Sequence, residues 1–164
     1  MTFVALAVAT LVLQRLLGIP GVPPWCGEAV VPMVLLVGST LSHSEQRTVW
    51  GALLLGLAWD VTLEPVVGPG GISWTASALA LQGLAAVLAD RSPRAWVAGG
   101  VVGVVVLVVA RELALLPLGL GSWSGWLAVA RGALLTGLWC GAVGCVLALD
   151  LPARWKRHRA RRLR

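Results

Sequence analysis

Six stretches of the chain are apolar almost throughout, and polar, glycine or proline residues separate them. The stretches cover 2–18, 28–42, 48–63, 72–89, 95–116 and 123–149. The breaks carry turn chemistry, as in the Gly-Pro-Gly-Gly sequence at 68–71 and the Ser-Pro at 92–93. A membrane-spanning helix needs about 20 mostly apolar residues, so this pattern predicts a bundle of six transmembrane helices.

The first two stretches need separate comment. The first contains no Lys or Arg before Arg15 and no small-residue cleavage site follows it, so we expect a retained span rather than a signal peptide. The second is the weakest, because it is short and contains Pro32, Ser39 and Thr40. It reaches across a membrane only if its flanks, from 25 to 43, are included.

The composition supports the membrane interpretation. Of the 164 residues, 58% are hydrophobic and 12% are charged, whereas a soluble domain carries about 25% charged residues. These proportions exclude a soluble enzyme, a disordered chain and a secreted disulfide scaffold. We therefore expect an all-α polytopic membrane protein, with a six-span domain over 1–152 and a basic cytoplasmic tail over 153–164.

The positions of Lys and Arg predict the orientation of the spans. Of 13 such residues, seven lie in the tail: Arg154, Lys156, Arg157, Arg159, Arg161, Arg162 and Arg164. Arg91 and Arg94 lie in the loop two spans before the tail, and Arg47 lies in the loop four spans before it. The loops on the other side of the membrane contain no Lys or Arg. Six spans with both termini cytoplasmic fit this distribution, and five spans with an external N-terminus are the alternative. The tail is expected to bind anionic lipid, with a cytoplasmic partner as the alternative; nucleic acid is not expected.

Tryptophans follow the predicted ends of the spans. Five are expected near the outer ends (Trp25, Trp59, Trp74, Trp123 and Trp126), three near the inner ends (Trp50, Trp96 and Trp155), and Trp139 alone is deep. This distribution predicts an interfacial belt.

Charged residues inside the spans gather in their predicted outer halves. They are Arg15, Asp60, Arg111, Glu112 and Arg131, with Glu64 just beyond, and their formal charges sum to zero. A charge at the centre of a spanning helix costs about 2.5–3.5 kcal/mol on insertion scales, which favours mutual neutralisation. We expect a polar cluster on the outer side with Asp60 paired to Arg131 or Arg111. The alternative is that several of these side chains extend to the lipid headgroups.

Glycines spaced four apart mark close helix contacts. Gly99 and Gly103 form one such pair, and Gly137 and Gly141 form another. Small residues let helices approach closely where the hydrophobic effect no longer drives association. The pairs indicate either packing within the bundle or a face for a partner's span.

No residue set points to catalysis, a metal or a cofactor. Cys26, Cys140 and Cys145 form no CxxC or Cys/His spacing. Asp60 is expected at the outer side, and Asp90 and Asp150 at the inner side, too far apart to share a catalytic water. Asp60 with Glu64 or Glu112 is the carboxylate pairing that these positions leave open. We therefore expect a protein that is not an enzyme.

The segment from 51 to 91 resembles the rod-shape-determining protein MreD of bacteria. In that family the third span ends in Gly-Leu-x-x-Asp, and a Gly follows eight residues after the Asp. Gly56, Leu57, Asp60 and Gly68 match this pattern. The sequence departs from the family at Val66 and Val67, where Pro-Leu is usual. The length, the number of spans and the basic tail are also similar.

The resemblance implies a role in assembly rather than catalysis. MreD proteins sit in the bacterial plasma membrane and bind MreC, and through it RodA, a class B penicillin-binding protein and MreB. They support rod shape and lateral peptidoglycan synthesis. The family also resembles the six-helix S components of energy-coupling-factor transporters, and a substrate-binding S component is the alternative function.

Overall fold

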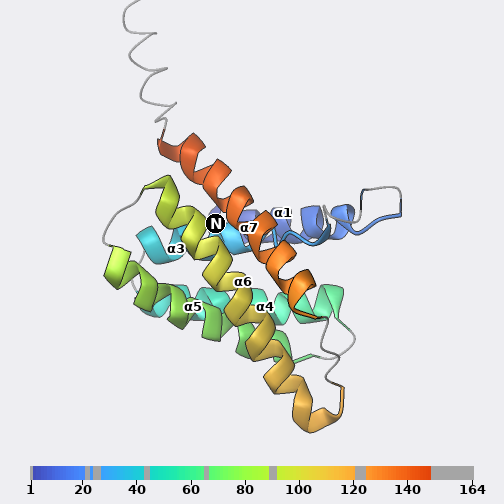
Figure 1. Cartoon of the computed structure of the whole chain (residues 1–164). Coiled ribbons are helices and arrows are strands. Elements are labelled where there is room, and N and C mark those ends of the chain that lie inside the picture. The colour runs from blue at the N-terminus through green and yellow to red at the C-terminus, as the bar shows by residue number, and fades with distance from the viewer. Residues whose placement is uncertain are drawn as a thin grey trace, which may run out of the picture.

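The computed structural model describes residues 2–20, 23, 27–42, 45–64, 67–88, 92–120 and 125–148. These residues form six α-helices and no strand. The helices are α1 (Thr2–Leu17), α3 (Met33–Ser42), α4 (Glu45–Leu63), α5 (Pro69–Leu88), α6 (Pro93–Leu115) and α7 (Trp126–Ala148) (Figure 1). A short 3-10 turn, η1 (Leu116–Leu118), extends α6. The all-α expectation is confirmed for this part of the chain.

The helix boundaries follow local chemistry. Pro69 and Pro93 occupy the first positions of α5 and α6, where the N–H that proline lacks has no helical partner. At its other end, α6 passes into η1 and stops at Gly119, which has a φ of 67°. Such left-handed backbone favours glycine and commonly ends a helix.

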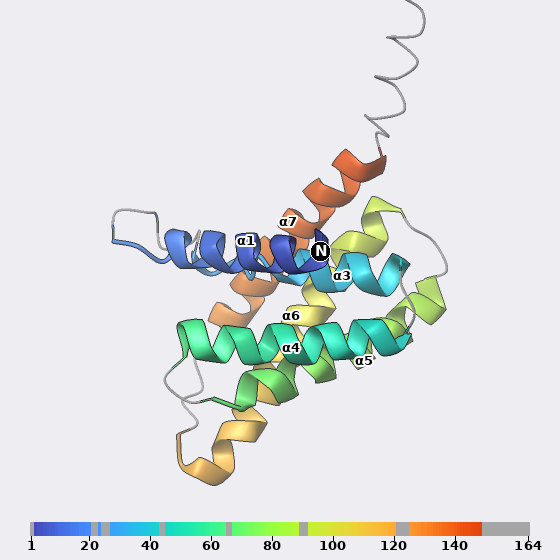
Figure 2. The same ribbon diagram turned by 180° about the vertical axis from the view of Figure 1, so that it is seen from behind.

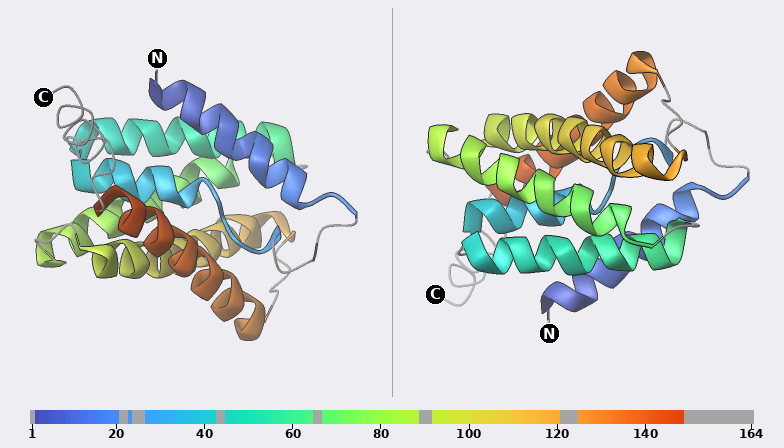
Figure 3. Two further views of the ribbon diagram at one scale, coloured as in Figure 1. Left: turned by 90° about the horizontal axis from the view of Figure 1, so that it is seen from above. Right: turned by 90° about the horizontal axis from the view of Figure 1, so that it is seen from below.

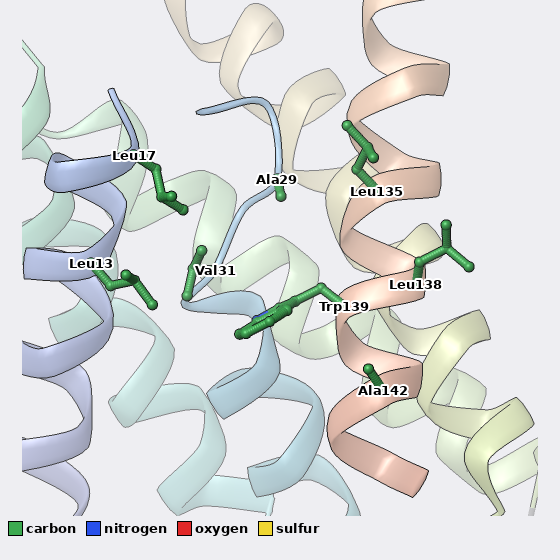
Figure 4. Close-up of a pocket in the computed structure, with 8 residues that line it drawn as sticks. All are labelled: Leu13, Leu17, Ala29, Val31, Leu135, Leu138, Trp139 and Ala142. Carbon is green, nitrogen blue, oxygen red and sulfur yellow. The ribbon is translucent and has the colours of Figure 1, made fainter. Parts of the chain in front are cut away.

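The second apolar stretch is not one continuous helix, contrary to the expectation for 28–42. Its helical part, α3, has 10 residues, which at 1.5 Å per residue span about 15 Å, or half a hydrocarbon layer. Pro32 explains the late start, because proline pushes the residue before it out of the helical region. The residues from 28 to 32 form turns and bends, and this segment lies between α1 and α7 (Figure 4).

Helices α4 to α7 are joined by short connections, and each packs antiparallel against the next (Figures 1 and 2). Helix α3 contacts all four of them, and Met33, Leu36 and Val37 are buried there. Helix α1 lies at the edge of the bundle, where it packs against α4 (Figure 3). Much of its surface is exposed.

Two tryptophans that were expected at the membrane interface are instead part of the core. Trp74 is 1% exposed and packs against Trp59, with ring centroids 5.7 Å apart. Trp96 is buried against α7, where a Cβ at Gly144 would lie 2.6 Å from its ring. The interfacial prediction was wrong for these two residues, because the space between the helices accommodates their rings. Trp50 and Trp126 are exposed.

Glycines bring α6 and α7 into backbone contact. A Cβ at Gly100 would lie 2.9 Å from the Cα of Gly137 and 3.0 Å from the carbonyl oxygen of Thr136. Gly99 packs against Val37 of α3. Gly103 faces the Met33 sulfur, and Gly141 faces Val97. The four glycines singled out in the sequence thus contact helices of the same chain rather than a vacant face.

Two described helices are long and apolar enough to cross a membrane, judged by length and composition. They cover Pro93–Leu118 and Trp126–Ala148. Shorter apolar helices cover Val4–Leu17 and Met33–Ser42.

The α6–α7 contact predicts that Gly100→Ala destabilises the protein. The added methyl meets backbone atoms that cannot move aside, and such overpacking costs about 1–3 kcal/mol. We expect a lower midpoint of thermal unfolding in detergent. Gly83→Ala is the matched control, since a Cβ at Gly83 meets nothing within 4 Å and alanine favours a helix over glycine. Equal midpoints for the two variants would contradict the contact.

Candidate functional site

The side chain of Asp60 joins the end of α4 to the start of α5. Asp60 is 1% exposed, and its carboxylate accepts hydrogen bonds from the backbone amides of Gly68, at 2.7 Å, and Gly70, at 3.0 Å. Amides at the start of a helix have no carbonyl partner within it. The carboxylate therefore caps α5 from the neighbouring helix, where the positive end of the helix dipole also favours its negative charge.

Glycine is required around this carboxylate. Gly68 has a φ of 127°, a conformation that side-chain-bearing residues rarely adopt. A Cβ at Gly56 would lie 2.5 Å from the carbonyl oxygen of Gly70, and a Cβ at Gly70 would collide with the Asp60 carboxylate. We call Gly56, Asp60, Gly68 and Gly70 the hairpin clasp. The clasp contains three of the four residues on which the MreD resemblance rests; the fourth, Leu57, is exposed.

The predicted pairing of Asp60 with Arg131 or Arg111 was wrong. Asp60 bonds to backbone amides, which sequence reasoning about charges did not consider. Arg111 instead pairs with Glu64, with an Nη2 to Oε2 distance of 2.6 Å. Arg131 pairs with Glu28, which lies in the segment before α3.

The expected outer-side cluster is therefore divided between separate contacts. Asp60 and Glu64 lie at the end of α4 and Arg111 lies near the end of α6, whereas Arg131 belongs to α7 and pairs with Glu28. Glu112 is buried, and Arg15 is exposed in the last turn of α1. The tail residues from 154 to 164 lie outside the described residues, as do Asp90 and Asp150.

The segment before α3 is held on both sides by hydrogen bonds. On the α1 side, the Gln14 amide donates to the Gly27 carbonyl at 3.2 Å, and its oxygen accepts from the Val31 amide at 2.8 Å. On the α7 side, the Thr136 hydroxyl accepts from the Val30 amide at 2.9 Å. Sequence analysis overlooked Gln14 and Thr136. Each is a polar residue within an apolar stretch of sequence, a pattern that indicates a specific hydrogen-bond partner.

An apolar groove lies between α1 and α7, with a volume of about 460 Å³ (Figure 4). Leu13 and Leu17 of α1 line one side, and Ala29 and Val31 of the connecting segment lie between the helices. The α7 side consists of Leu135, Leu138, Trp139 and Ala142. The indole of Trp139 extends across the groove toward Val31 (Figure 4).

Neither the residue chemistry nor similarity to known proteins assigns a reaction to this chain. Among the described residues, no group of three or more His, Cys, Asp or Glu side chains could hold a metal ion. No family model, curated protein or solved structure matches the chain. Function must therefore be inferred from the chain's own residues and from the resemblance of its 51–91 segment.

The hairpin clasp predicts that Asp60→Asn destabilises the protein. Asparagine replaces one acceptor oxygen with an NH₂ group that faces the backbone amides, and an unsatisfied buried polar group costs about 1–3 kcal/mol. We expect a lower thermal midpoint in detergent. Glu45→Gln, at the exposed start of α4, is the control for loss of a carboxylate. If Asp60→Asn and Glu45→Gln have the same thermal midpoint, the Asp60 carboxylate does not hold the hairpin together.

Proposed function

We propose that the chain is a non-catalytic integral membrane scaffold of the MreD type. It crosses the bacterial plasma membrane six times with both termini in the cytoplasm. It binds MreC and, through MreC, positions RodA, a class B penicillin-binding protein and MreB for lateral wall synthesis. The observation that carries this proposal is the hairpin clasp, because it gives a physical reason for the family spacing of eight residues between Asp60 and Gly68.

The distribution of charge over the two ends of the bundle supports this orientation. Arg47 and Arg94 are exposed near the starts of α4 and α6, which lie at the same end because α5 runs between them. At the opposite end, Arg111 and Arg131 are paired with glutamates. Cytoplasmic ends carry the excess of Lys and Arg, so the end with Arg47 and Arg94 is the cytoplasmic one.

The hydrogen bonds of buried polar groups also suit a bilayer, where no water is available to bind such groups. The Ser73 hydroxyl donates to the Gly70 carbonyl and the Ser77 hydroxyl to the Gly103 carbonyl, each at 3.0 Å. Among the described residues, no buried side-chain nitrogen or oxygen lacks a hydrogen-bond partner. The non-helical segment before α3 is tolerated at membrane depth because Gln14 and Thr136 bind its backbone.

The transporter alternative is less well supported. An S component needs polar side chains converging on a pocket that faces outward, to hold a vitamin or a metal. Four of the outer charges are already paired, Asp60 with backbone amides and Glu64, Arg111 and Arg131 in ion pairs. The groove between α1 and α7 is lined by apolar side chains, which suit hydrocarbon rather than a polar ligand.

Affinity purification of the full chain from native membranes in mild detergent tests the proposal. We expect mass spectrometry to identify MreC, with or without the synthase pair. Recovery of a membrane coupling protein with two ATPases would contradict the proposal and support the transporter alternative.

Gly68→Leu tests whether the hairpin clasp is where the partner binds. Leucine is strained at a φ of 127° and displaces the turn, so we expect loss of MreC from the purified complex and loss of rod shape. Gly125→Leu is the matched control, because Gly125 has a φ of 81° and a Cβ there would meet nothing within 4 Å, but it lies before α7. MreC retained equally by both variants would place the partner elsewhere.

A further inference from the structure

The groove between α1 and α7 leaves apolar surface without a protein partner. Trp139 is 41% exposed and Leu13 is 38% exposed, although both line the groove. The side chains that line an empty apolar gap lack dispersion contacts on the side that faces it. In a bilayer such a gap is filled by hydrocarbon or by a partner's side chains, provided that it opens toward the lipid.

A pair of opposite charges lies at one end of this groove. Glu28 directly precedes Ala29, which lines the groove, and Arg131 lies one helical turn before Leu135. Arg131, Leu135, Leu138 and Ala142 follow one another at spacings of four, three and four residues, so they share one face of α7. The Glu28–Arg131 ion pair is partly exposed, with 32% and 57% of the two side chains accessible.

We propose that this groove binds one molecule of a zwitterionic phospholipid with a primary ammonium head group, phosphatidylethanolamine. One acyl chain lies along Leu13, Leu135 and Trp139. The phosphate binds Arg131 and the ammonium binds Glu28. The proposal rests on the membrane location within the proposed function, but not on MreC binding.

The charge pair selects this head group over the other common ones. An anionic head group would compete with Glu28 for Arg131 and leave the carboxylate without its cation. The quaternary ammonium of phosphatidylcholine has no N–H to donate to Glu28. A primary ammonium donates to the carboxylate while the phosphate accepts from the guanidinium, and both are charge-assisted hydrogen bonds.

The segment between the two helices favours a lipid chain over a partner's helix. A helix with its side chains is about 10–12 Å across, whereas an acyl chain is a single file of CH₂ groups. The segment carrying Ala29 and Val31 lies between α1 and α7 (Figure 4), which limits how closely a helix can approach.

Native mass spectrometry of the purified full chain tests the proposal. The protein is incubated with an equimolar mixture of dioleoyl phosphatidylethanolamine, phosphatidylcholine and phosphatidylglycerol. We expect one phosphatidylethanolamine molecule per chain, in about two- to five-fold excess over phosphatidylcholine, as expected for a partly exposed charge pair. The basic tail is the same in all variants, so phosphatidylglycerol bound there does not change the differences between variants.

Two substitutions separate the head-group site from the groove. Glu28→Gln frees Arg131, so we expect phosphatidylethanolamine binding to fall and phosphatidylglycerol binding to rise, each by about two- to five-fold. The phenyl ring of Ala142→Phe fills the groove, so we expect this variant to lose the bound phosphatidylethanolamine. Ala148→Phe is its control, since Ala148 is exposed at the end of α7 and does not line the groove. Thermal midpoints of all variants show whether the fold is kept.

Other outcomes overturn the proposal. Equal binding of all three lipids, unchanged in Glu28→Gln, would show that the groove does not select a head group. If a photoreactive amino acid at position 138 cross-links in native membranes to a polypeptide and not to lipid, a partner's helix occupies the groove. The lipid-binding comparison uses the chain purified free of partners, so its result does not depend on whether MreC binds.

Discussion

The hydrogen bonds from the amides of Gly68 and Gly70 to the buried carboxylate of Asp60 set the geometry of the bundle. They hold the start of α5 against the end of α4 and allow the turn to be short. The close approach of Gly56 to Gly70 depends on the same turn. A buried carboxylate without partners is costly, so the turn and the charge are stable only together.

The remaining helices are built onto this hairpin by close contacts. Helix α5 packs on α6, where Ser77 bonds to the carbonyl of Gly103, and α6 meets α7 where Gly100 lies against Gly137. Helix α3 fills the centre with Met33 and its neighbours. Helix α1 is the exception. It is held by Gln14 and by contacts with α4, and its separation from α7 creates the groove.

The sequence predicts the helices well and the polar contacts poorly. Apolar periodicity and prolines place five of the six helices to within a few residues, but α3 starts five residues later than the predicted span because turns around Pro32 replace its first part. The pairing of Asp60 was mispredicted because its partners are backbone amides, which every residue except proline carries, so no residue type signals them. The groove was not predicted, since it depends on the distance between the first and last helices.

Mapping which side of the membrane each turn faces tests the central claim, that the bundle spans the membrane with the hairpin clasp outside. In a variant with Cys26, Cys140 and Cys145 replaced by alanine, single cysteines are introduced as Val67→Cys and Arg47→Cys, both at exposed positions. An impermeant maleimide is then added to intact cells. We predict that position 67 is labelled in intact cells and position 47 only after permeabilisation. The reverse pattern, or labelling of both positions in intact cells, would contradict it.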